Sequence, residues 1–140
     1  MKVFLDTNVI LDVLASREPF VSDSAAVLSL VEARTLEGFT AAHSITTLFY
    51  LLRREIGSAR AREILLDLLR VLEVVAVDQD RIFQALAMDW EDFEDAVQAS
   101  CAAKAEVDYL LTRDREDFRG SYVPVLSPAE FMALHGRDAE

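Results

Sequence analysis

The 140-residue chain has little cysteine, proline, glycine or positive charge: 1 Cys, 3 Pro and 4 Gly, with 14 Lys and Arg against 25 Asp and Glu. The single cysteine, Cys101, excludes an intrachain disulfide framework and a cysteine-rich zinc site. The scarcity of Gly and Pro beside 52% hydrophobic residues excludes collagen-like and disordered sequence. We expect a single domain over residues 1–140.

Long hydrophobic runs are also missing. The apolar run near the start ends at Asp6, which is too early for the core of a signal peptide. No stretch approaches the roughly 20 apolar residues of a membrane span. We therefore expect a cytoplasmic protein without membrane association.

The deficit of positive charge is uneven along the chain. Residues 1–70 carry 9 acids and 8 bases, whereas residues 71–140 carry 16 acids and 6 bases. The net charge of −11 disfavours simple binding of nucleic acid, because affinity for phosphate comes mainly from Lys and Arg. The acidic half is either a solvated face or a group of carboxylates with a function.

Short apolar runs alternate with segments of helical spacing. The predicted strands cover 2–5, 39–42, 71–77, 109–112 and 122–126, where Pro124 places the last one at an edge. The predicted helices cover 8–15, 22–35, 44–56, 58–69, 81–87, 91–104 and 127–134. This alternation predicts an α/β fold, a three-layer α/β/α sandwich around a mainly parallel sheet.

Five acids fall where ligands bind in such sheets, at the carboxyl ends of the strands. Asp6 follows the first strand, Asp114 and Asp117 follow the fourth, and Asp92 and Asp95 lie one turn apart at the start of the preceding helix. A structural role is open for each, as a helix cap or as a charge favoured by the helix dipole. The second interpretation is a shared pocket of carboxylates.

Carboxylates gathered this closely repel one another unless a cation offsets them. Ligands that are all oxygen favour Mg²⁺ or Mn²⁺ over zinc. Such an ion activates water and neutralises charge on a phosphodiester, and it would make an acidic pocket attractive to RNA. A small-molecule phosphohydrolase is disfavoured, because Asp6-Thr7-Asn8 lacks the second acid of an Asp-x-Asp motif.

Two segments, FLDTNVILD (Phe4–Asp12) and DFEDAVQASCAAKAEVDYLLTRDREDF (Asp92–Phe118), resemble motifs of the PIN-domain family. That family includes the VapC-type toxins of bacterial toxin–antitoxin pairs. The resemblance implies a five-stranded sheet in the order 3-2-1-4-5. It also implies a Mg²⁺- or Mn²⁺-dependent ribonuclease acting as the toxin of a type II pair, a homodimer, and an antitoxin protein as partner.

The resemblance assigns roles by position. Asp6, Asp95 and Asp114 match metal ligands, while Asp92 and Asp117 complete the shell or orient the attacking water. The residues that match the hydroxyl and amide supports of these acids are Thr7, Asn8, Ser44 and Thr112.

One position departs from the family pattern. Tyr50 stands where the second motif commonly has Glu, and a phenol cannot replace a carboxylate ligand. The alternative function is therefore a weak or inactive PIN-like module that binds RNA or protein.

Several side chains outside the acidic group have two interpretations. Arg53, Arg54, Arg113 and Arg115 are candidates for contact with RNA phosphates, or are solvated surface residues. Phe93 beside Asp92 could stack on a base or pack within the protein. The helix over 44–56 is apolar almost all round, which favours a subunit interface.

Overall fold

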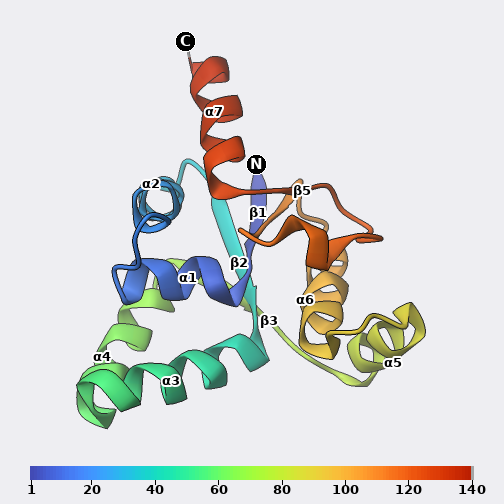
Figure 1. Cartoon of the computed structure of the whole chain (residues 1–140), viewed down its shortest axis with the longest axis horizontal. Coiled ribbons are helices and arrows are strands. Elements are labelled where there is room, and N and C mark those ends of the chain that lie inside the picture. Colours follow the sequence, from blue (N-terminus) through green and yellow to red (C-terminus); the bar gives the residue numbers. More distant parts are fainter. Residues whose placement is uncertain (140) are drawn as a thin grey trace.

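Five parallel strands form one sheet, in the order β3-β2-β1-β4-β5, in the computed structural model of the protein (Figure 1). The structure describes the backbone of residues 1–139 and the side chains of residues 1–135. The strands are β1 (Lys2–Leu5), β2 (Glu37–Ala41), β3 (Leu72–Val75), β4 (Tyr109–Leu111) and β5 (Val125–Leu126). The predicted fold class and strand order are confirmed.

Helices cover both faces of the sheet, as Figure 1 shows. One face carries α1 (Thr7–Leu14), α2 (Val21–Glu32), α3 (Ala42–Ile56), α4 (Ser58–Leu68) and α7 (Pro128–Ala139). The other face carries α5 (Gln79–Met88), α6 (Phe93–Lys104) and a 3-10 turn, η1 (Arg115–Phe118).

The central strand β1 is buried on both faces of the sheet. Val3 and Leu5 pack in one core, Phe4 packs in the other, and all three are almost completely buried. Side chains alternate along a strand, so a continuous apolar run is what a strand covered on both faces needs. Cys101 is buried in the α5–α6 core as a free thiol, the small core residue that its alanine-rich surroundings indicate.

The predicted elements all exist, and the differences lie at their ends. The second strand begins at Glu37 and the third ends at Val75, while the last helix continues to Ala139. The weak fifth strand contracts to Val125–Leu126, because Pro124 at its start has no amide to donate. The turn η1 lies outside the predicted helices, at the place where Asp114 or Asp117 could cap a short turn. Residue 140 of the expected domain lies outside the described part.

The chain enters α1 immediately after β1, and enters α3 immediately after β2. The carboxyl ends of β1, β2 and β4 therefore deliver Asp6, the start of α3 and Thr112 to one edge of the sheet. Within the described residues, no helix combines the length and the apolar character needed to cross a bilayer.

Candidate active site

Asp6 is the buried centre of the site. The residue is only 2% exposed, and both carboxylate oxygens accept hydrogen bonds from side chains. Gln98 Nε2 donates to Oδ1 at 2.9 Å, and Thr112 Oγ1 donates to Oδ2 at 2.7 Å. Asp6 occupies the N-cap position of α1, but its side chain makes no capping hydrogen bond there, so the carboxylate is free to accept from Gln98 and Thr112.

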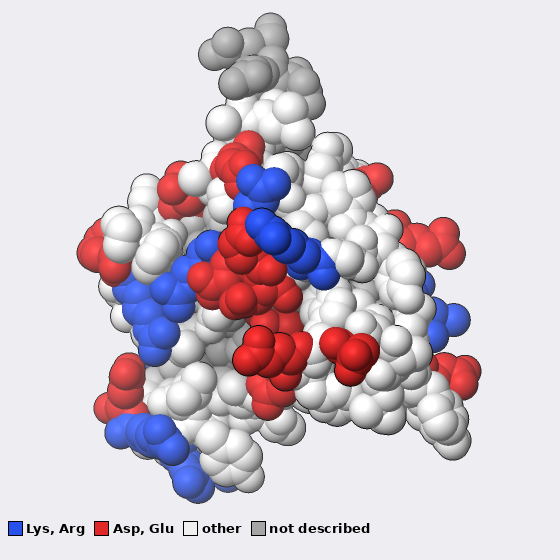
Figure 2. All heavy atoms as spheres, turned by 45° about the vertical axis from the view of Figure 1, so that its right-hand side comes forward, with Lys and Arg blue, Asp and Glu red and all other residues white. Residues whose placement is uncertain are grey.

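Asp95 is the residue on which the charges of all the other acids act. Burial raises the pKa of Asp95 to about 7, and the charges of Asp6, Asp92, Asp117 and Asp114 add to that rise. Burial also raises the pKa of Asp6, against the hydrogen bonds from Thr112 and Gln98 that lower it. The fold thus brings together five acids, although the first and the last of them lie more than 100 positions apart in the sequence. Figure 2 shows acidic side chains gathered on one face of the molecule, with Lys and Arg beside them.

Gln98 is the functional residue that sequence reasoning missed. It is 3% exposed and joins α6 to the start of α1 as well as to Asp6, because its Oε1 also accepts the backbone N–H of Thr7 at 3.1 Å. The hydroxyl of Thr7 in turn donates to Ser44 Oγ at 2.7 Å. The available signal was an amide side chain three residues after Asp95, on the same face of a helix rich in alanine.

Asp114 is held by the turn that follows β4. Its backbone N–H donates to Thr112 Oγ1 at 3.1 Å, and its Oδ2 accepts from Asn8 Nδ2 at 3.4 Å. The N–H of Asp117 donates to the carbonyl of Asp114 at 3.0 Å and closes η1. Thr112 therefore supports both Asp6 and Asp114, with the same hydroxyl.

Asp92 has the structural role that was open for it. Its Oδ1 accepts the N–H of Asp95 at 3.1 Å and caps α6. This bond leaves the charge of Asp92 one turn before Asp95, where it contributes to the raised pKa of that residue. The cap and the acidic cluster are therefore compatible roles of one side chain.

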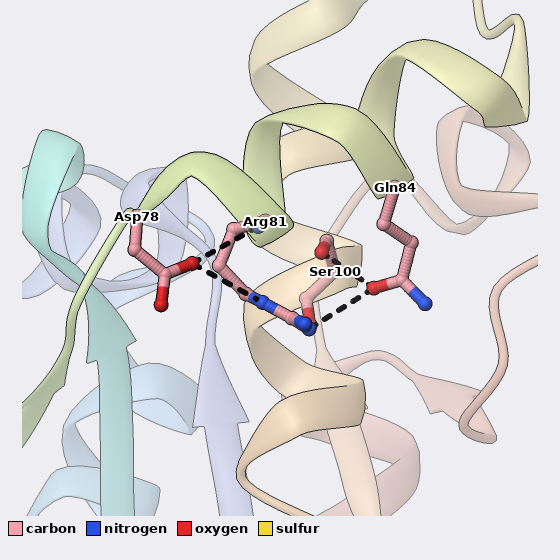
Figure 3. Close-up of polar contacts among 4 residues, drawn as sticks. All are labelled: Asp78, Arg81, Gln84 and Ser100. Atoms are coloured by element: carbon pink, nitrogen blue, oxygen red, sulfur yellow. Dashed lines mark hydrogen bonds and ion pairs between the residues drawn. The ribbon is translucent and has the colours of Figure 1, made fainter.

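A polar clamp fixes the helix that carries Asp95 and Gln98 (Figure 3). Arg81 in α5 donates to the carbonyl of Ser100 at 3.1 Å, and Gln84 Oε1 accepts from Ser100 Oγ at 2.6 Å. Asp78 caps α5 and lies 3.7 Å from the Arg81 guanidinium. Since these contacts join α5 to α6, they restrain the position of α6 relative to α5.

The four candidate RNA-contacting arginines lie in different environments. The guanidinium of Arg53 lies 5.1 Å from the ring centre of Tyr50, which is 55% exposed, and Arg54 is exposed. Arg115 pairs with Glu130 at 2.7 Å. Arg113 is directed inward, where its Nε lies 3.4 Å from the carboxylate of Asp12.

An open hollow of about 710 Å³ adjoins the acidic group. Its lining is Trp90, Glu91, Asp92, Phe93, Glu94, Glu116, Asp117 and Arg119. Trp90 packs edge-on against Phe118 in the core, whereas Phe93 remains 42% exposed. The hollow shares Asp92 and Asp117 with the acids around Asp95, so a molecule bound at Asp95 could extend into it.

The donor set fits a hard divalent cation by chemistry, since every candidate ligand is a carboxylate oxygen and their mutual repulsion is uncompensated. As the side chains lie, no three Asp, Glu, His or Cys groups in the described part of the chain are close enough to hold one ion together. Asp95 and Asp114 therefore have to turn toward Asp6 to share an ion.

Comparison with known proteins agrees with this geometry. Residues 2–116 match the PIN domain family. Ribonuclease VapC1 of Aquifex aeolicus (strain VF5) is 26% identical over 135 residues, which cover 93% of this chain and 92% of that protein.

Two solved structures have the same fold at low sequence identity. A toxin-antitoxin complex from Klebsiella pneumoniae superposes with a TM-score of 0.69 at 19% identity, over 90% of this chain and 97% of that one. VapBC2 from Rickettsia felis, bound to a DNA fragment from its promoter, gives 0.68 at 15% identity, over 91% and 98%. With the family match over residues 2–116, the parallel sheet and the carboxylates at its edge, the chain belongs to the PIN domain family.

Proposed function

We propose that the protein is a metal-dependent endoribonuclease that cleaves RNA phosphodiesters with water, and that it acts in the cytoplasm as the toxin of a type II toxin–antitoxin pair. The observation that carries the proposal is the gathering of carboxylates from distant segments at one sheet edge, around a buried Asp6 that Gln98 and Thr112 hold in place. A ribonuclease relative that covers 93% of the chain supports the substrate class.

The residues divide the chemistry between them. Asp6, Asp95 and Asp114 would hold Mg²⁺ or Mn²⁺, which when bound activates water and neutralises phosphate charge. Gln98 and Thr112 fix the Asp6 carboxylate, and Asp92 and Asp117 orient the attacking water. Water attacks phosphorus, the bond to the 3′ oxygen breaks, and that oxygen takes a proton, which gives a 5′-phosphate and a 3′-hydroxyl.

The hollow beside the site suits a nucleotide that flanks the cleaved bond. The exposed ring of Phe93 offers a stacking surface, and the carboxylates around it repel phosphate but accept hydrogen bonds from base amino groups. Phe93→Ala should raise KM for RNA and leave kcat nearly unchanged. An unchanged KM would place the base elsewhere.

The decisive experiment is a cleavage assay on structured RNA with Mg²⁺ or Mn²⁺, with and without EDTA. Cleavage should require the ion, leave a 5′-phosphate and disappear in Asp6→Asn. Asp67→Asn, which alters an exposed acid paired with Arg70, is the matched control and should cleave normally. Cleavage that survives both EDTA and Asp6→Asn would show that a contaminating or metal-independent nuclease is responsible.

A second candidate function is an inactive PIN-like module that binds RNA or protein. Tyr50 favours it, because this exposed side chain replaces the usual acid of the second motif. Metal-independent RNA binding without any cleavage would support this alternative.

The proposed partners are an antitoxin protein and a second copy of this chain. A solved structure of the same fold that is described as a toxin-antitoxin complex supports the first. Apolar side chains exposed on α3, on α4 and at the end of α4 support the second, because a second copy could cover them: Tyr50, Ile56, Leu66 and Leu69. Co-expression with the product of any adjacent small gene, followed by mass measurement of the complex by light scattering, tests both.

A further inference from the structure

A buried ion pair behind the site has no role in the function proposed above. Asp12, in the last turn of α1, has a side chain that is 0% exposed. Neither of its carboxylate oxygens accepts a hydrogen bond from a described residue. Arg113 supplies the charge that faces it, with Nε at 3.4 Å from Oδ2. A carboxylate in this environment depends on that charge, because burial without a partner disfavours its ionised form.

Arg113 is held on its other side by an aromatic ring. Its guanidinium carbon lies 4.4 Å from the ring centre of Phe20, and the side chain is only 25% exposed. The planar guanidinium therefore lies between the buried Asp12 and Phe20, an arrangement that limits its freedom. Arg17 also faces Asp12 electrostatically, but Arg113 has the larger effect on it.

The pair is one of three contacts that join consecutive residues after β4 to the segment 6–12. The segment that begins at β1 contacts three consecutive residues after β4: Asp6 accepts from Thr112, Asp12 faces Arg113, and Asn8 donates to Asp114. The middle contact is the only one of the three that touches neither Asp6 nor Asp114. It can therefore fix the turn without itself entering the site.

From this juxtaposition we propose that Asp12 and Arg113 are positioning residues, whose buried ion pair holds the turn 112–114 against α1 and so sets Asp114 beside Asp6. This assignment replaces an RNA-phosphate contact for Arg113. The expected effect of the pair on metal affinity rests on the proposed function, whereas its expected effect on the rigidity of the turn does not.

The test uses a double replacement, because Arg113→Met alone would leave Asp12 buried without a counter-charge. In Asp12→Leu/Arg113→Met the pair becomes apolar side chains of similar size that still pack on Phe20. The matched control, Asp67→Leu/Arg70→Met, removes an ion pair whose side chains are 72% and 79% exposed. Amide hydrogen exchange over residues 112–117 and calorimetric Mn²⁺ affinity are then measured in the full chain.

We expect the folded double variant to exchange the amides of this turn about tenfold faster, with the rest of the sheet unchanged. Mn²⁺ affinity should fall about 10–100-fold, the size of effect typical of residues that orient metal ligands. The surface control should match the wild type in both measurements.

Wild-type exchange at the turn in the folded double variant would overturn the proposal. So would a raised KM for RNA with unchanged exchange, since that result describes a phosphate contact. If the wild-type protein binds no Mn²⁺, the proposed function fails, while the exchange measurement still decides the positioning role. If the double variant does not fold, Arg113→Lys serves instead: it keeps the charge but loses the planar stacking, and exchange at the turn should still rise selectively.

Discussion

The two sides of the acidic site are built on different principles. On the β1 side, Asp6 is almost fully buried and each of its oxygens accepts a bond from a neutral donor, Gln98 or Thr112. On the α6 side, Asp95 is surrounded by four other acids, and its pKa rises to about 7. Neutral donors can orient a carboxylate without cancelling its charge. One side is therefore arranged in advance, and the other needs a cation to become fully ionised at neutral pH.

The largest expected effect comes from removing the oriented charge. Asp6→Asn keeps the shape of the side chain but presents an amide to Gln98 or Thr112, so a donor meets a donor. Cleavage should fall to the level seen with EDTA, and Mn²⁺ binding by calorimetry should be lost. Activity near that of the wild type would mean that Asp6 is not the centre of the site.

A smaller effect should follow from removing a donor while keeping the charge. Gln98→Leu leaves Asp6 with one bond from Thr112, and we expect roughly 10–100-fold weaker Mn²⁺ binding, as for other residues that orient ligands. Gln79→Leu, at an exposed position on α5, is the matched control. If Gln98→Leu binds Mn²⁺ like the control, orientation by this amide is unnecessary.

The raised pKa of Asp95 on the α6 side should make the stability of the protein depend on pH. The pKa of Asp95 rises from 3.8 to about 7 on folding, so the folded protein holds this proton more tightly than the unfolded chain does. The resulting stabilisation is present at low pH and is lost as the pH rises through about 7. Without added metal, Asp95→Asn should therefore melt above the wild type at alkaline pH, and the difference should shrink toward acid.

Thermal melts of the wild type, Asp95→Asn and the exposed control Asp80→Asn, each in EDTA across this pH range, make the measurement. If the melting temperatures of the wild type and Asp95→Asn stay equal as the pH rises, charges are not crowded at Asp95. Added Mn²⁺ should reverse the order, because only the wild type gains from binding the ion.

The smallest effect should come from Asp92. Asp92→Asn retains an oxygen that can accept from the N–H of Asp95, so α6 keeps its cap. The change removes one of the negative charges that raise the pKa of Asp95, so this pKa should fall below about 7. The fall should be small, because burial is the largest cause of the raised pKa and the substitution leaves it in place. Titration of the Asp95 carboxyl by NMR measures this shift. An unchanged pKa would mean that the two side chains do not interact.

Much of the architecture could be predicted from local pattern. The apolar run that ends at Asp6 indicated a strand, which the fold buries on both faces, and Asp92 precedes a helix that it caps. Element ends were less certain, because competing caps and the tight turn η1 depend on contacts between segments. The acids were identified because residue types near strand ends are visible in sequence.

What the sequence could not indicate is how the acids are held. Gln98 looks like any polar residue on a helix, and Arg113 looks like a base beside an acidic site. Only their burial and partners distinguish them: Gln98 donates to Asp6 from 92 positions away, and Arg113 faces the buried Asp12. The partner of neither side chain can be predicted from the spacing of residues along one helix or strand.

The sequence by itself determined the α/β alternation, the sheet order through its family motifs, and the set of five acids at strand and helix ends. These features depend on side-chain period and composition, which are local properties of a chain. The tertiary structure alone decided which acid is buried and oriented and which is crowded by like charges. Burial and electrostatic interaction are set by distances through space, and those distances exist only after the sheet and α6 have packed together.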